Sequence, residues 1–104
     1  MTYAYLVDVP APIEAYDAVH AAVDRRSGGH ADGLIVHFAR TTPTGFQVLE
    51  IWESKDQADR FGAEVVGPAM AEDGGPAAEG PEPERVEFEA RGLMGAGVRA
   101  ATAT

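Results

Sequence analysis

The chain has 104 residues, a formal net charge of −9 and no cysteine. Its length fits one domain, and its acidity argues against binding to nucleic acid or to an anionic membrane surface. Without cysteine, the chain can form no disulfide, and it has neither a thiol nucleophile nor a cysteine-ligated metal site.

The first part of the chain predicts a strand followed by an amphipathic helix. Residues 3–9 are rich in β-branched and aromatic side chains, and Pro10 ends this run. Apolar residues then recur at helical spacing, and the pair Gly28-Gly29 is typical of a helix end. We therefore expect a strand over 3–9 and a helix over 12–26.

Residues 34–53 predict a β-hairpin that is apolar on both of its faces. Two strand-like runs, 34–40 and 46–53, flank a turn over 42–45. Side chains alternate between the two faces of a strand. One face receives Leu34, Val36, Phe38, Leu49 and Ile51, and the other receives Ile35, Ala39, Phe46, Val48 and Trp52. An antiparallel sheet with one wet face would alternate apolar and polar residues, so we expect both faces to be covered.

A second helix is predicted directly after the hairpin. Ser54 and Gln57 have the spacing of a capping box, in which each residue satisfies a free backbone group of the first turn. The Gly67-Pro68 pair should bend the helix or bring it near its end. The expected buried stripe consists of Ala58, Phe61, Val65 and Ala69.

The last predicted element is a short strand over 85–90, where apolar and charged residues alternate. Residues 95–104 show no pattern, and we expect a disordered tail after a single domain over 1–94. The order β-α-β-β-α-β predicts the ferredoxin-like α+β fold, a four-stranded antiparallel sheet with two helices on one face. A second copy of the chain is the simplest cover for the other face, which predicts a homodimer.

The stretch from Gly45 to Lys55, followed by an amphipathic helix that carries Phe61, resembles the dimeric α/β-barrel superfamily. More narrowly, it is similar to small proteins related to the antibiotic-biosynthesis monooxygenases, and the likeness in topology extends over about residues 3–92. The resemblance implies a homodimeric barrel with a pocket between sheet and helices. Characterised relatives oxidise polyphenolic polyketides without metal or flavin, cleave haem, or isomerise and cyclise small molecules.

Two functions therefore remain open. The first is a cofactor-independent monooxygenase, or a cyclase or isomerase, that acts on a small aromatic or polyketide-like molecule. The second is a non-catalytic dimeric module that binds small molecules or is associated with stress, with a pocket filled by side chains. A cavity of roughly 300 Å³ or more would favour the first.

The hairpin register predicts one candidate catalytic pair. With the turn centred on residues 43–44, His37 stands directly opposite Glu50, and opposed Cβ atoms lie about 4.5–5.5 Å apart. A carboxylate beside an imidazole orients the ring and increases its basicity, so the pair suits proton transfer with His37 as the base. The alternative is an inert cross-strand polar pair.

Five further residues are candidates for ligand binding. Tyr5 and Tyr16 can form hydrogen bonds with a phenol or a carbonyl group, and Trp52 can form an apolar wall. His20 lies on the apolar stripe of the first helix and would hang over the sheet. Arg40, at the end of a strand, could hold an anionic group. For the tyrosines, Trp52 and His20, packing in the core is the alternative.

We expect no cofactor and no metal. The haem-degrading relatives use a histidine late in the second helix, and residues 65–72 contain none. A metal site formed by His37, Glu50 and His20 is a less favoured alternative. The sequence contains no apolar run of the roughly 20 residues that span a bilayer, and its start resembles no signal peptide. A cytoplasmic location is therefore expected.

Overall fold

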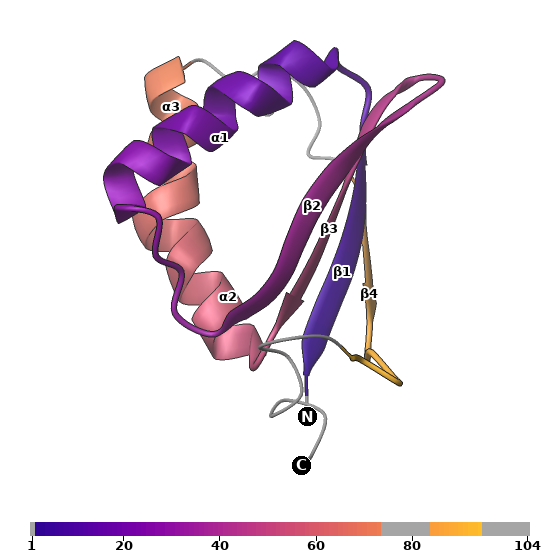
Figure 1. The fold of residues 1–104 in the computed structure, drawn as a ribbon. Helices are drawn as coiled ribbons and strands as arrows, with labels where there is room; N and C mark the ends of the chain where they lie inside the picture. The colour runs from indigo at the N-terminus through magenta and orange to yellow at the C-terminus, as the bar shows by residue number, and fades with distance from the viewer. Residues whose placement is uncertain (1, 74–83, 95–104) are drawn as a thin grey trace.

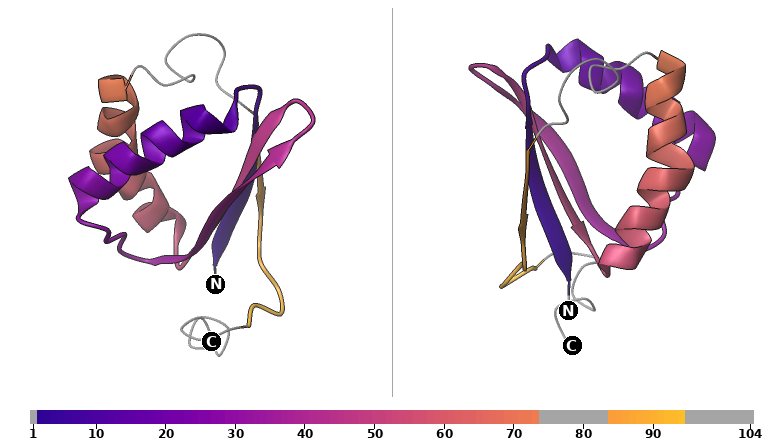
Figure 2. Two further views of the ribbon diagram at one scale, coloured as in Figure 1. Left: turned by 45° about the horizontal axis from the view of Figure 1, so that its top comes forward. Right: turned by 180° about the vertical axis from the view of Figure 1, so that it is seen from behind.

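The chain folds into one four-stranded antiparallel sheet with its helices on one face (Figure 1). The computed structural model describes residues 2–73 and 84–94, so the predicted disordered tail lies outside the described residues. The strands follow the order β2-β3-β1-β4, and Figure 2 shows the helices on the same side of the sheet in both views. The predicted ferredoxin-like arrangement is confirmed.

The elements occur in the predicted order. They are β1 (Tyr3–Val9), α1 (Ile13–Ser27), β2 (Leu34–Thr42), β3 (Gly45–Trp52), α2 (Lys55–Phe61), the π-helical turn η1 (Gly62–Val66), α3 (Gly67–Asp73) and β4 (Arg85–Phe88). Within the described residues, none of the helices has both the length and the apolar content needed to cross a bilayer.

Helix α1 ends as its sequence predicts. Gly28 adopts a left-handed conformation with φ of 67°, and its N–H group donates to the carbonyl oxygen of Asp24 at 2.9 Å. This conformation favours glycine because it has no Cβ. Arg25 and Arg26, in the last turn of α1, pair with Glu72 of α3 at 3.1 and 2.9 Å. These exposed pairs contribute little energy but join the two helices.

The second helix begins at the predicted N-cap, Ser54, with one of the two backbone contacts of a capping box. The Ser54 hydroxyl oxygen accepts the N–H group of Gln57 at 3.2 Å and donates to the Gln57 side chain at 2.8 Å. The helix does not end at Gly67-Pro68 but widens into the π-helical turn η1 just before it. Since proline lacks an N–H group and its ring crowds the preceding turn, a wider turn accommodates it.

The π-helical turn shifts the phase of the buried stripe. Phe61, Val66 and Met70 face the sheet side together, spaced by five and then four residues. The stripe predicted from a constant helical period contained Val65 instead of Val66. The wider turn therefore brings Met70, which the sequence analysis did not place, toward the interior.

The register of the hairpin matches the prediction over most of its length, and His37 is paired with Glu50. An irregularity between Leu34 and Val36 places Leu34, rather than Ile35, opposite Trp52. An extra residue in one strand reverses the alternation of side chains beyond it. The prediction that Leu34 shares a face with Val36 is therefore wrong, and Leu34 faces the helices.

The face of the sheet that points away from the helices is largely apolar. Two rows of apolar side chains cross all four strands, one formed by Phe38, Leu49, Leu6 and Val86 and the other by Val36, Ile51, Ala4 and Phe88. Ala4 and Ile51 are buried, but Phe38, Val86 and Phe88 remain 47, 57 and 37% exposed. The apolar outer edges of this face are therefore in contact with solvent in a single chain.

Strand β4 is shorter than predicted and ends at Phe88 instead of Ala90. It is paired on one side only, with β1. Its apolar residues lie on the outward face, and Arg85 and Glu87 lie on the face toward the helices, opposite Val7 and Tyr5. The charged residues of this strand therefore lie beside the interior and not on the outward face.

Candidate functional site

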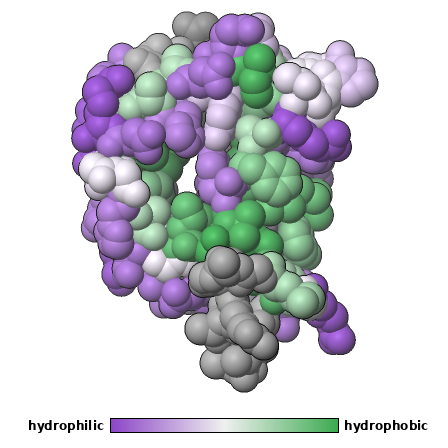
Figure 3. Space-filling model, in the orientation of Figure 1, coloured by the Kyte–Doolittle hydropathy of each residue, from purple (hydrophilic) through white to green (hydrophobic). Residues whose placement is uncertain are grey.

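A cavity of about 670 Å³ lies between the sheet and the helices. Strands β1, β2 and β3 form its floor with Tyr5, His37 and Glu50, and helix α1 covers it with Tyr16 and His20. In the space-filling view, an opening leads into the molecule between the helical side and the sheet (Figure 3). The cavity exceeds the volume that separates a binding pocket from a closed core.

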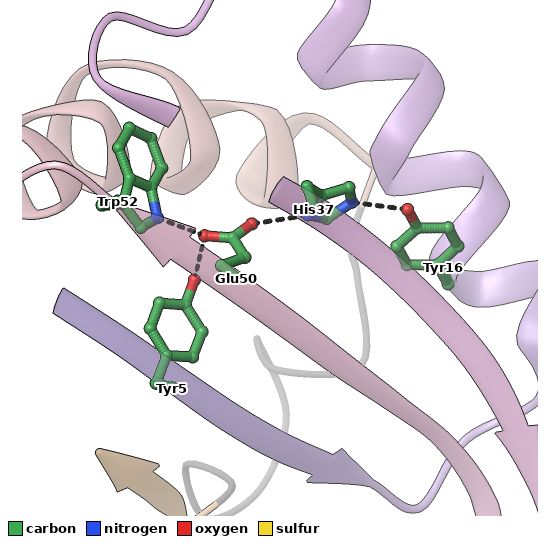
Figure 4. A network of polar contacts seen from close by, with 5 residues as sticks. All are labelled: Tyr5, Tyr16, His37, Glu50 and Trp52. Carbon is green, nitrogen blue, oxygen red and sulfur yellow. Dashed lines mark hydrogen bonds and ion pairs between the residues drawn. The ribbon is translucent and has the colours of Figure 1, made fainter. Parts of the chain in front are cut away.

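His37 and Glu50 meet on the floor of this cavity. They are paired across strands β2 and β3, and the imidazole Nδ1 lies 2.7 Å from Oε2 of Glu50. The side chains are 22 and 13% exposed, respectively. The predicted pair is therefore formed, and Figure 4 shows it at the centre of a network that includes Tyr5, Tyr16 and Trp52.

Glu50 accepts three hydrogen bonds. Besides the imidazole, the Tyr5 hydroxyl and the Trp52 indole N–H donate to its Oε1, the latter at 2.8 Å. Burial disfavours the charged carboxylate, but the three hydrogen bonds outweigh burial and lower the pKa of Glu50 below its ordinary value. Glu50 is therefore ionised at neutral pH.

The ionised Glu50 determines which nitrogen of His37 carries a proton. A carboxylate can only accept hydrogen bonds, so Nδ1 of His37 must be the protonated nitrogen at this contact. In a neutral imidazole, Nε2 is then the acceptor. Nε2 is the nitrogen that lies 2.6 Å from the Tyr16 hydroxyl.

Tyr16 therefore donates its hydroxyl proton to Nε2 of His37. Burial raises the pKa of Tyr16, and the negative charge of Glu50 adds to this effect, so the phenol remains protonated at neutral pH. The three side chains form a chain of hydrogen bonds in which Tyr16 donates to His37 and His37 donates to Glu50. Within this chain, Nε2 is the atom of the His37 ring that can accept a proton.

His20 lies against the same network without a recorded hydrogen bond to it. Its ring stacks on His37 at a centroid distance of 5.6 Å and an angle of 24°, and it lies 5.5 Å from the ring of Tyr16. Its Nδ1 is 3.8 Å from the Asp24 carboxylate. The structure thus brings His20 into the cavity wall, as the sequence analysis expected.

Trp52 does not form a wall of the cavity, contrary to the expectation from the sequence. It is almost fully buried, at 1% exposure, and its ring packs against Phe61 at 5.5 Å. Its polar contact is with Glu50. Trp52 therefore holds the Glu50 carboxylate through this hydrogen bond and does not line the cavity directly.

The structure does not bring Arg40 to the cavity. Arg40 lies on the outward face, where its Nε donates to Gln47 at 3.0 Å, and Gln47 in turn donates to Asp8 at 3.2 Å. Arg40 comes three positions after His37, so strand alternation alone puts them on opposite faces. The expectation that Arg40 holds a ligand in this pocket has no support.

A different arginine, Arg85 of β4, lines the cavity. Its guanidinium carbon lies 4.1 Å from the centroid of the Tyr5 ring, and its Nη1 donates to the Tyr3 hydroxyl at 3.2 Å. The sequence analysis missed it because strand alternation in 85–90 does not reveal which face turns inward. The pairing of Arg85 with Val7 settles that question.

Over residues 2–73 and 84–94, no group of three or more histidine, aspartate or glutamate side chains is arranged to hold a metal ion. His20 is thus stacked on His37 but forms no ligand set with His37 and Glu50. The contacts of this cluster are hydrogen bonds and ring stacking.

No family model matches the chain, and no curated protein matches it. Solved structures do match. A candidate antibiotic biosynthesis monooxygenase from Chloroflexus aurantiacus J-10-fl has a TM-score of 0.66 at 17% identity, covering 91% of this chain and 98% of that one. Rv0793 from Mycobacterium tuberculosis has a TM-score of 0.61 at 13% identity, covering 91 and 100%.

SnoaB, a cofactor-independent oxygenase from Streptomyces nogalater, matches with a TM-score of 0.58 at 16% identity, covering 89% of this chain and 94% of that one. Identities this low establish the fold and leave the activity open. The chain therefore has the ferredoxin-like fold of the antibiotic-biosynthesis-monooxygenase-like proteins, over nearly its whole length.

Proposed function

We propose that the protein is an enzyme that removes a proton from a small aromatic hydroxy compound and uses the resulting anion for oxygenation, cyclisation or isomerisation. The observation that carries this proposal is the His37–Glu50 pair, which faces a cavity of about 670 Å³. An inert structural pair would need no such space beside it. The likeness to SnoaB, itself a cofactor-independent oxygenase, is consistent with the oxygenation branch.

His37 is the proposed base. Its Nε2 accepts the proton of a substrate hydroxyl that takes the place of Tyr16, and the imidazolium formed is stabilised by the ionised Glu50. Tyr5 and Trp52 hold Glu50 in position through their hydrogen bonds. Because Glu50 fixes the ring through Nδ1, Nε2 remains directed toward the incoming hydroxyl.

In the oxygenation branch, the phenolate carries enough electron density at a ring carbon to attack dioxygen. A carbon–oxygen bond forms, and the peroxide takes the proton from the imidazolium. His37 then takes the hydrogen on the same carbon as a proton, the oxygen–oxygen bond breaks, and hydroxide leaves. The imidazolium protonates this hydroxide, which yields a quinone and one water from one phenol and one dioxygen. His37 thus serves twice as the base and twice as the acid.

The proposal is tested by oxygen consumption and product analysis with polycyclic phenols and hydroquinones, comparing the parent protein with His37→Gln. We expect quinone formation by the parent, and a rate at least about a hundredfold lower in the variant. Circular dichroism and a thermal melt establish that the variant is folded. If His37→Gln forms products at the rate of the parent, the assigned base is wrong.

The same experiment distinguishes the alternative function, a module that only binds small molecules. The size of the cavity argues against a closed core, but a binding module could also contain a cavity. Such a module would bind aromatic probes in the pocket and form no product from any of them. Binding with a complete absence of turnover across the panel would favour it.

We further propose that two copies of the chain pack through the outward face of the sheet. The two apolar rows on this face, with Phe38, Val86 and Phe88 left exposed, form a surface that a second sheet would bury. This face is separate from the cavity, which lies on the helical side. The dimer would thus protect the sheet and leave the site of each copy intact.

A further inference from the structure

The cavity has a cationic end that the proposed proton transfer does not use. Arg85 is the one arginine or lysine among the described residues that line it. Among the same described residues, its guanidinium forms no ion pair with a carboxylate. Its recorded hydrogen bond goes to an uncharged tyrosine hydroxyl. In a chain with net charge −9, a guanidinium at a cavity wall that pairs with no carboxylate of residues 2–73 or 84–94 calls for an explanation.

Two aromatic residues hold this guanidinium in place. Tyr5 presents its ring face to Arg85 at 4.1 Å, and Tyr3 accepts a hydrogen bond from it at 3.2 Å. Tyr3 in turn donates to Glu87 at 2.5 Å, which orients the tyrosine hydroxyl. A guanidinium has five N–H donors, so most remain available to an acceptor in the cavity. This arrangement is preorganised for a planar, bidentate anion such as a carboxylate.

The sheet separates the strands that position this cation and the proposed base. His37 lies on β2, and the Tyr5 ring under Arg85 comes from β1, with β3 between them. Neighbouring strands lie about 4.8 Å apart, so the backbones of these two strands are roughly 10 Å apart. A ligand that reaches both groups must therefore extend across β3.

We propose, building on the function proposed above, that Arg85 binds an anionic group of the substrate while His37 receives the proton of a hydroxyl at its opposite end. The substrate class is then an aromatic phenol that carries a carboxylate at the end of its ring system opposite the reacting hydroxyl. Glu50, which is hydrogen-bonded to His37, would repel a carboxylate placed at the His37 end. The charges of Arg85 and Glu50 thus determine the direction in which the ligand enters.

Binding of two related probes tests this assignment without any requirement for turnover. The probes are 6-hydroxy-2-naphthoate and 2-naphthol, which share the ring system and the hydroxyl and differ in the carboxylate. We expect the parent protein to bind the hydroxynaphthoate at least about tenfold more tightly, as a charge-assisted bidentate contact implies. Isothermal titration calorimetry measures both dissociation constants.

Two variants test whether the carboxylate preference depends on Arg85. Arg85→Gln should reduce the preference to about twofold or less while leaving the affinity for 2-naphthol unchanged. Arg60→Gln, at an exposed position on α2, is the matched control and should keep the full preference. Equal binding of the two probes by the parent overturns the proposal, and so does a preference that survives Arg85→Gln.

The result is distinguishable from a failure of the proposed function. A carboxylate preference that depends on Arg85, found together with no turnover of any phenol, would support the anion subsite and contradict the enzyme. Turnover that depends on His37, found without a carboxylate preference, would contradict the subsite alone. Failure of both probes to bind the parent also overturns the subsite.

Discussion

His37 and Glu50 stand opposite each other on neighbouring antiparallel strands, and their side chains meet at 2.7 Å between Nδ1 and Oε2. Three further side chains form hydrogen bonds with this pair. Tyr5 and Trp52 hold the carboxylate, and Tyr16 takes the free nitrogen of the imidazole. The site is therefore one connected network, in which the ionised carboxylate fixes the orientation of the base.

Glu50→Gln should reduce the stability of the fold. The substitution removes a buried negative charge that accepts three hydrogen bonds, and the amide N–H₂ group of glutamine cannot accept any of them. We expect the free energy of unfolding to fall by about 3 kcal/mol. Urea denaturation with an unchanged m-value measures the loss.

Glu53→Gln is the matched control for this variant. Glu53 directly follows β3, the strand that carries Glu50, and its side chain is exposed. Its replacement should therefore change the free energy of unfolding by less than about 0.5 kcal/mol. If Glu50→Gln unfolds at the same urea concentration as the parent, Glu50 does not carry the buried charge described above.

The lowered pKa of Glu50 predicts how stability depends on pH. The folded protein holds this carboxylate ionised below its ordinary pKa of 4.5, whereas the unfolded chain takes up the proton near that value. The stabilisation is therefore complete above pH 4.5 and is lost as the pH falls through the lower folded pKa. The slope for one group is at most about 1.4 kcal/mol per pH unit.

The difference in unfolding free energy between the parent and Glu50→Gln isolates this contribution. Other carboxylates also titrate in this range, including Glu72, whose pKa is lowered by Arg25 and Arg26. These groups are shared by the two proteins, so they cancel in the difference. We expect the difference to shrink as the pH falls below 4.5. A difference that stays constant down to pH 3 would contradict the assignment.

The proposed dimer predicts the effect of a charge on the outward face. Phe38 lies in the first of the two apolar rows and is 47% exposed. Phe38→Glu would place a negative charge within the proposed buried contact, so we expect a monomer where the parent is a dimer. Sedimentation velocity at micromolar concentration distinguishes the two states. A parent protein that sediments as a folded monomer would rule out the dimer.

The fold and its central pair could be predicted from the sequence because both depend on periodicity. Alternation and turn residues defined the hairpin, and its register placed His37 opposite Glu50. The capping box at Ser54 marked the start of the second helix. Each of these signals is local, since it is contained in about twenty consecutive residues or fewer.

The remaining features depend on contacts between distant segments. The irregularity next to Leu34 and the π-helical turn before Gly67 each shift the side-chain phase by one residue, and a constant period cannot reveal such shifts. The inward placement of Arg85 depends on how β4 pairs with β1. Arg40 is the exception, because alternation along its own strand was enough to separate it from His37.

The most direct test of the central claim is ¹⁵N NMR of the imidazole of His37 at neutral pH, which reports the protonation of each ring nitrogen. We predict that the neutral form of the ring is protonated on Nδ1 and unprotonated on Nε2, because the ionised Glu50 accepts the Nδ1 proton. The His37→Gln variant identifies the signal by its loss. A ring protonated on Nε2 would contradict the assignment of this nitrogen as the base.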